Sequence, residues 1–100
     1  MNNKIDSFLS LASRARKLIS GQDMVITDLK SFKRKTLLVI IATDAKDKTK
    51  EEVKLACDRA GVMLIEYSTK DELGRLIGKD TRSVIGITDE NFKEGIIKSM

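Results

Sequence analysis

The first residues with the chemistry of a binding site surround Gly21, in the stretch ISGQDMVITDLK. Arg14 and Lys17 precede this glycine, and a helix is expected to begin just after it. The start of a helix offers unpaired N–H groups and a partial positive charge, and glycine leaves room for close approach to the backbone. The pattern suits an anion. It equally suits an ordinary helix start, capped by a box of Ser20 and Asp23.

A second basic group lies in ELGRLIGKDTRSV, residues 72–84. Gly74 stands inside a helical pattern, where glycine costs about 1 kcal/mol relative to alanine. Such a glycine indicates close packing or close approach of a partner. The segment after it is expected to be a basic loop that either binds an anion or is simply solvated. The residues concerned are Arg75, Gly78, Lys79, Asp80, Thr81 and Arg82.

Two further features have a functional and an ordinary interpretation. The run KSFKRK, residues 30–35, is either a solvated charged face or a surface that holds phosphates across a groove. Cys57 lies on the apolar side of an expected helix. We interpret it as a buried structural thiol, because no histidine or second cysteine is present to activate it.

The composition excludes several classes of site. There is no histidine and only one cysteine, so a histidine-based catalytic triad, a zinc site of the usual kind and an intrachain disulfide are excluded. The glycine-rich phosphate-binding motifs of nucleotide-binding enzymes are absent as well. No cluster of potential catalytic groups is visible, so we expect no enzyme, no cofactor and no metal.

Charge and length point to a small domain with an anionic partner. The chain has 100 residues and a net charge of +4, which suits one domain over residues 1–100 and a partner such as RNA. No apolar run approaches the ~20 residues of a membrane span. The start, MNNKIDSF, lacks the apolar block of a signal peptide. We therefore expect a cytoplasmic monomer that does not bind membranes.

The apolar spacing predicts an alternation of helices and strands. The predicted helices are 3–17, 22–32, 48–60, 70–78 and 90–98, and the predicted strands are 36–42, 62–67 and 83–88. In the second helix, Val25, Leu29 and Phe32 are expected to face the core. This order favours an α/β/α sandwich with helices on both faces of the sheet.

Residues at the helix ends support these boundaries. Asp47 is expected to cap the third helix, and Gly61 to end it. Ser68 or Thr69 is expected to cap the fourth helix, which Gly78 ends. Thr88 or Asp89 is expected to cap the last helix.

Three stretches, LASRARKLISGQDMV, LLVIIATDAKDKTK and ELGRLIGKDTRSVIGITD, resemble a known family. They are similar, in order and over nearly the whole chain, to the YlxQ-like bacterial branch of the kink-turn-binding ribosomal-protein superfamily. The resemblance implies a small three-layer α/β/α sandwich with a mixed sheet of about four strands. It also implies binding of structured RNA, because members of the superfamily clamp sharply bent duplexes at tandem sheared G·A pairs. Their contacts come from the start of the second helix and the loop after ELGR.

The superfamily's motif at the second helix is G-x-N-E, followed three residues later by Lys. Gly21 matches this motif, whereas Asp23, Met24 and Thr27 replace the usual Asn, Glu and Lys. The Glu normally accepts hydrogen bonds from guanine edges. We expect Asp23 to supply that acceptor from one position earlier, and phosphate binding at this helix to be weaker.

The resemblance and the basic segments together predict an RNA-binding module, associated with the ribosome or with translation. The alternative is a protein-interaction domain on the same scaffold, and an enzyme is a distant third. The expected RNA-binding residues are Arg14, Lys17, Gly21, Gln22, Asp23, Met24, Thr27, Arg75, Gly78, Lys79, Asp80, Thr81 and Arg82.

Overall fold

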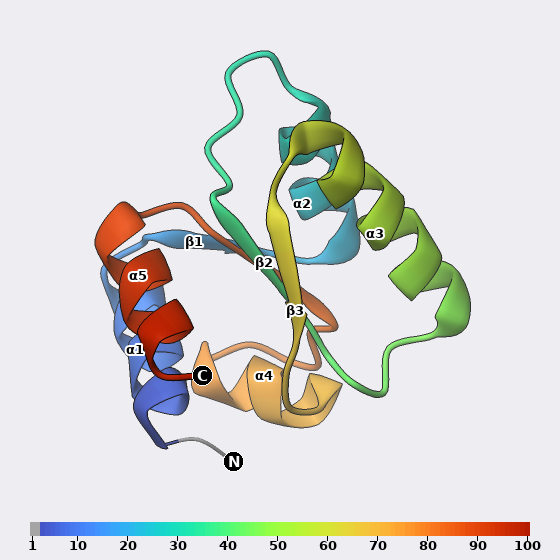
Figure 1. Cartoon of the computed structure of the whole chain (residues 1–100). Helices are drawn as coiled ribbons and strands as arrows, with labels where there is room; N and C mark the ends of the chain where they lie inside the picture. The colour runs from blue at the N-terminus through green and yellow to red at the C-terminus, as the bar shows by residue number, and fades with distance from the viewer. Residues whose placement is uncertain (1–2) are drawn as a thin grey trace.

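A central β-sheet with helices on both faces forms the molecule, in a computed structural model that describes residues 3–100. The elements are α1 (Asn3–Arg14), β1 (Leu18–Ser20), α2 (Gln22–Lys30), β2 (Leu38–Ile41), α3 (Asp47–Ala60), β3 (Met63–Glu66), α4 (Lys70–Leu76), β4 (Val84–Ile87) and α5 (Glu90–Lys98). Figure 1 shows α2 and α3 on one side of the sheet and α1, α4 and α5 on the other. This arrangement confirms the expected three-layer α/β/α sandwich.

The sheet is four-stranded and mixed, in the order β1-β4-β2-β3. β2 and β3 are parallel and are connected through α3, whereas β4 is antiparallel to both β2 and β1. The sequence predicts no strand at 18–20. These three residues form one because they pair with β4, with Leu18 opposite Ile87 and Ser20 opposite Ile85.

The core lies on both faces of the two central strands. Every residue of β2 and β4 is buried. Each helix adds a side chain that is fully excluded from solvent. These are Leu9, Val25, Val53, Leu73 and Ile96. Burying an aliphatic side chain of this size contributes about 1.5–3 kcal/mol, so each helix is held to the sheet chiefly by its apolar side.

Most helix ends follow the predicted chemistry. Gly61 ends α3 in the left-handed conformation, with φ 70°. The Thr69 hydroxyl accepts a hydrogen bond from the backbone N–H of Glu72 and so caps α4. The Asp89 carboxylate accepts one from the N–H of Phe92 and caps α5. The sequence left Ser68 or Thr69, and Thr88 or Asp89, as possible caps. The structure shows that Thr69 and Asp89 are the caps.

Two predicted caps are wrong. Ser20 belongs to β1, Gly21 is the N-cap of α2, and no side chain caps that helix. The capping box of Ser20 and Asp23 therefore does not form, because the strand pairing continues through Ser20 and the N-cap position falls one residue later, at Gly21. Asp47 is the first residue of α3, and Lys46 occupies the N-cap position.

The predicted ends of the first two helices are also too late. α1 ends at Arg14 because Arg16 adopts φ 57°, which turns the chain so that the N–H of Lys17 bonds to the carbonyl of Ala12. α2 ends at Lys30. Phe32, predicted to lie in the core, follows the helix in a loop and is fully exposed, at 102%.

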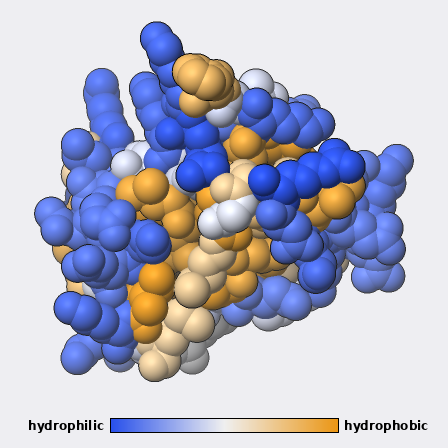
Figure 2. Space-filling view, turned by 45° about the horizontal axis from the view of Figure 1, so that its top comes forward, coloured by the Kyte–Doolittle hydropathy of each residue, from blue (hydrophilic) through white to orange (hydrophobic). Residues whose placement is uncertain are grey.

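The surface is mainly hydrophilic. Figure 2 shows hydrophilic side chains surrounding a band of hydrophobic surface on one face of the molecule. Within residues 3–100, none of the helices combines the length and the apolar character needed to cross a bilayer.

Candidate nucleic-acid interface

The antiparallel pairing of β1 with β4 brings the two predicted glycine-centred segments together. β1 leads directly into α2, and β4 follows directly on the loop after α4. At the end of the pairing, the N–H of Gly21 donates to the carbonyl of Val84, over 2.9 Å. The start of α2 and the end of the loop therefore lie side by side at one end of the sheet.

Gly21 occupies a backbone conformation that favours glycine. Its φ is +98°, and a Cβ atom added there would meet no atom within 4 Å. The glycine is thus required by its backbone and leaves open space in front of it. Because no side chain caps α2, the first N–H groups of the helix are available to an anion.

The outer side of α2 borders a shallow groove. Asp23, Met24 and Thr27 are exposed on this side, and the Met24 side chain is 62% exposed. Asp23, Met24 and Thr27 line the groove together with Ile19, Asp28, Ser31 and Lys35. The predicted site residues of α2 therefore share one surface, except for Gln22.

Gln22 points toward α3. Its side-chain Nε2 donates to Oε2 of Glu52 over 2.6 Å, and its Oε1 accepts from the hydroxyl of Thr49 over 3.1 Å. Both ends of the amide are engaged, so Gln22 fixes the start of α2 against α3.

The loop after α4 folds back along its own helix. A Cβ at Gly74 would lie 1.7 Å from the carbonyl oxygen of Asp80, so this glycine is required by close packing within the protein. The N–H of Lys79 donates to the carbonyl of Gly74 and the N–H of Arg82 to that of Lys70, over 2.8 and 3.0 Å. These bonds hold the loop, with Lys79 and Thr81 exposed to solvent.

Arg14 and Arg75 meet at a hollow between α1 and the end of α4. Both line it together with Ser10, Ser13, Leu76, Ile77 and Gly78. The Ser13 hydroxyl donates to the carbonyl of Ile77 over 3.0 Å and joins the two helices. The structure thus brings Arg14, Arg75 and Gly78 together at one hollow.

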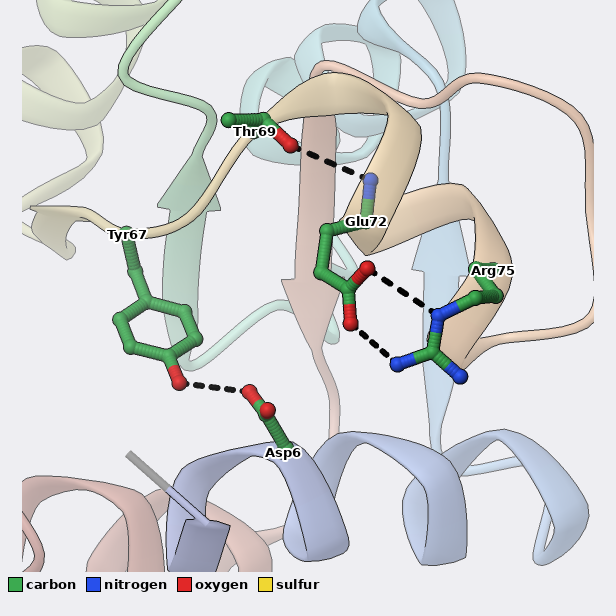
Figure 3. A network of polar contacts seen from close by, with 5 residues as sticks. All are labelled: Asp6, Tyr67, Thr69, Glu72 and Arg75. Carbon is green, nitrogen blue, oxygen red and sulfur yellow. Dashed lines mark hydrogen bonds and ion pairs between the residues drawn. The ribbon is translucent and has the colours of Figure 1, made fainter. Parts of the chain in front are cut away.

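Arg75 already has an acidic partner. Its guanidinium binds Glu72 through two nitrogen atoms, with Nε 3.1 Å from Oε2, as Figure 3 shows. The hydrogen bond and the charge of Arg75 hold the pKa of Glu72 below its ordinary value. The Arg75 side chain is 67% exposed and the Glu72 side chain is 28% exposed, so an anion from solution can reach the guanidinium.

The Tyr67 hydroxyl is engaged in a hydrogen bond within the protein. Its hydroxyl donates to Oδ1 of Asp6 over 2.5 Å, which Figure 3 shows as a link between the end of β3 and α1.

Lys17 is separated from Gly21 by the length of β1. Its carbonyl accepts from the N–H of Thr88, beyond the far end of β4. The nearness of the two residues in sequence is misleading, since an extended strand lies between them. Conversely, sequence reasoning missed the contribution of Ile19, Asp28 and Ser31 to the groove. All of them lie in stretches that the sequence had singled out, residues 19–30 and 30–35, but none was named as a site residue.

Comparison with known protein families identifies the family of this chain. Residues 3–97 match the model of the "Ribosomal protein L7Ae/L30e/S12e/Gadd45 family". The chain belongs to this family.

Relatives of this L7Ae-type chain include two bacterial proteins named RNA-binding protein YlxQ. The protein of Bacillus subtilis (strain 168) is 37% identical over 89 residues, 89% of this chain and 87% of its own. The protein of Enterococcus faecium is also 37% identical over 89 residues, 89% of this chain and 84% of its own. The predicted YlxQ-like bacterial branch is thereby confirmed.

Solved structures show the same fold as this L7Ae-type chain. A protein of unknown function from Bacillus halodurans C has a TM-score of 0.88 and 30% identity, over 98% of this chain and 96% of its own. The Giardia lamblia 15.5kD RNA binding protein has a TM-score of 0.78 over 95% of this chain and 80% of its own. Its identity of 21% supports the fold alone.

Proposed function

We propose that this chain binds structured RNA, in the form of a kink-turn-like bent duplex with sheared G·A pairs. The contacts come from the start of α2 and from the loop after α4. The observation that carries the proposal is the bond between Gly21 and Val84, which places these two segments side by side. The names of the two YlxQ relatives, each 37% identical, support RNA as the partner.

The residues at this end of the sheet have complementary tasks in the proposed complex. The uncapped N–H groups at the start of α2 receive a phosphate at the open space before Gly21. The Asp23 carboxylate accepts hydrogen bonds from guanine, whose N1–H and exocyclic amino group are the donors on its Watson–Crick edge. Met24 offers apolar contact to a base or sugar, and Lys79 and Arg82 neutralise phosphates.

The family description supports a more specific setting. It names ribosomal proteins, and we propose that the bound RNA is ribosomal or otherwise associated with translation in the cytoplasm. Sedimentation of the tagged protein with ribosomal particles, retained at moderate salt, is the expected result. Recovery in the unbound fraction alone would contradict this setting.

The central experiment compares two RNAs that differ in their bend. Affinity is measured for a G·A kink-turn and for a straight duplex, with the wild-type protein, Asp23→Ala and Gly21→Val. Because Asp23 makes no cap, Asp23→Ala should change the free energy of unfolding by no more than about 0.5 kcal/mol. It should weaken kink-turn binding about 5- to 150-fold, the equivalent of ~1–3 kcal/mol. Gly21→Val should weaken binding through steric hindrance and strain its backbone.

A matched control is Glu90→Ala, which removes an exposed carboxylate from the first turn of α5. Its affinity ratio for the two RNAs should equal that of the wild-type protein. An unchanged ratio in Asp23→Ala would contradict the guanine-reading role. Absence of binding to either RNA by the folded wild-type protein would favour the alternative, a protein-interaction domain.

A further inference from the structure

The loop between α2 and β2 presents an aromatic side chain to solvent. Phe32 is fully exposed, at 102%, more than any other large hydrophobic side chain of the described residues. In Figure 1 this loop projects from the end of the molecule, and the view of Figure 2 turns that end toward the reader. Single exposed apolar residues are common, so the meaning of Phe32 depends on how it is held and on its neighbours.

Hydrogen bonds on both sides hold the loop in place. The Asp28 carboxylate accepts from the N–H of Lys35, and from the N–H and hydroxyl of Thr36 over 2.8 and 2.6 Å. On the other side, the N–H of Lys33 donates to the Ser31 hydroxyl. The backbone on both sides of Phe32 is therefore held, which reduces the backbone entropy lost when the ring binds.

A further hydrogen bond attaches the tip of the loop to the neighbouring helix. Nη1 of Arg34 donates to the carbonyl of Ala60, the last residue of α3, over 2.7 Å. This bond engages the exposed Arg34 side chain within the protein, which leaves the lysines to meet a ligand.

Lysines flank Phe32 in the sequence. Lys30, Lys33 and Lys35 are all exposed. Across residues 3–100, none of the three lies within 4 Å of a carboxylate oxygen in an ion pair. The charge of Lys35 also acts on the Asp28 carboxylate. An exposed aromatic ring flanked by exposed lysines is suited to a nucleic-acid strand, in which a stacking base alternates with negative phosphates.

The groove beside α2 connects this loop with the proposed RNA site. Asp23 and Met24 line it near the start of the helix, and Ser31 and Lys35 line it at the end. The nine residues of α2 span about 13 Å at 1.5 Å per residue. One RNA molecule can therefore reach both ends along a continuous surface.

We propose that the loop of residues 31–35 is a second RNA contact, in which Phe32 stacks on an unpaired base next to the bent duplex. Lys30, Lys33 and Lys35 neutralise the phosphates on either side of that base. The inference rests on the proposed function for the position of the duplex. It adds the requirement that the preferred RNA carries an unpaired nucleotide beside its bent region.

The test separates the base from the phosphate. Three single-stranded nucleotides are added to a kink-turn RNA, at one end or the other. Each extension is made in two forms, one with normal bases and one with abasic sites that keep the sugar–phosphate chain. The ratio of the two affinities measures stacking alone. The wild-type protein should prefer the normal extension about 5- to 150-fold, the range expected for stacking of one base on an aromatic side chain.

Variants assign this preference to the loop. In Phe32→Ala the preference should fall to about 1, and in Phe32→Tyr it should persist. Lys33→Gln should keep it, while the slope of log affinity against log salt becomes shallower by about 0.7. The control is Leu55→Ala, which truncates a half-exposed side chain on α3 and should leave the preference unchanged.

Failure of this inference can be distinguished from failure of the proposed function. The ratio of the affinities for normal and abasic RNA is also measured with a single-stranded pentanucleotide, which contains no kink-turn and therefore tests the loop alone. The preference for a bent over a straight duplex tests the start of α2 separately. A preference for normal bases that persists in folded Phe32→Ala would overturn the second contact. So would concentration-dependent self-association that is lost in Phe32→Ala while RNA binding is retained, because the ring would then serve a protein interface.

Discussion

A Cβ atom added at Gly74 would lie 1.7 Å from the carbonyl oxygen of Asp80, whereas one added at Gly21 would meet no atom within 4 Å. Both glycines belong to segments that the sequence singled out, and both suggest close approach of another group. At Gly74 that group is the protein's own loop. At Gly21 the space is open and the backbone has φ +98°, which leaves the start of α2 as the stronger candidate for contact with RNA.

Cys57 is a structural residue with an unreactive thiol. It is 1% exposed, and burial together with the charge of Asp58 raises the pKa of the thiol to about 11. Cys57→Ser places a hydroxyl in an apolar site and should lower the free energy of unfolding by about 1–2 kcal/mol. RNA affinity of the folded variant should not change. Urea unfolding and an RNA titration on the same sample measure both quantities.

Two controls accompany the substitution. Cys57→Ala removes the sulfur without burying a hydroxyl and therefore separates the cavity from the polar group. In the wild-type protein, a thiol reagent at pH 8 should react slowly when the chain is folded and rapidly in denaturant, because the thiol stays protonated well above that pH. Rapid labelling of the folded protein, or loss of RNA affinity in folded Cys57→Ser, would contradict the structural role.

At the scale of elements, Asp28 determines how α2 is connected to β2. Burial pushes the pKa of Asp28 upward, but hydrogen bonds from Thr36 and Lys35, with the charge of Lys35, bring it below its ordinary value. An ionised carboxylate in such a position stabilises the fold above the unfolded-state pKa of about 3.9. That contribution is lost as the pH falls through the lower pKa of the folded state.

Asp28→Asn tests this connection. The asparagine amide replaces one acceptor oxygen with a donor that faces other donors, so we expect a loss of about 1–2 kcal/mol at pH 7. The difference between the two proteins should shrink as the pH is lowered from 5 toward 2, since the wild-type carboxylate then becomes protonated. Urea unfolding of both proteins at several pH values measures this difference in the free energy of unfolding. Asp58→Asn, at an exposed position paired with Lys54, should differ from wild type by less than about 1 kcal/mol. A difference for Asp28→Asn that is constant with pH would refute the role of its charge.

At the scale of the whole molecule, the chain has a net charge of +4. Several of its basic residues belong to the proposed RNA contacts. About 3–5 phosphate contacts should give a slope of about −2 to −4 for log affinity against log salt. Titration of one kink-turn RNA at several KCl concentrations measures the slope. Lys79→Gln should make it shallower by about 0.7–0.9, and Lys98→Gln, at the end of α5 and outside the proposed contacts, should not change it. A response independent of salt would remove the electrostatic part of the interface.

The sequence by itself determined the elements whose signals are local. The buried run that forms β2 and the left-handed Gly61 after α3 depend on residues close together in the chain. The positions of the caps before α4 and α5 were narrowed to two residues each, and the structure decided for Thr69 and Asp89. Their identities follow from backbone sterics and from hydrogen bonds over a few positions. The family motifs added the overall architecture and the two segments of the candidate site.

Only the tertiary structure decided how those segments meet. β1 has three residues, too few for a period to show, and exists through its pairing with β4. That pairing separates Lys17 from Gly21, prevents the capping box at Ser20 and brings Gly21 against Val84. Phe32 continues the apolar spacing of α2, yet the helix stops before it and Asp28 binds the chain beyond it. Such contacts join residues that are distant in sequence or outside a regular period, so no local pattern can reveal them.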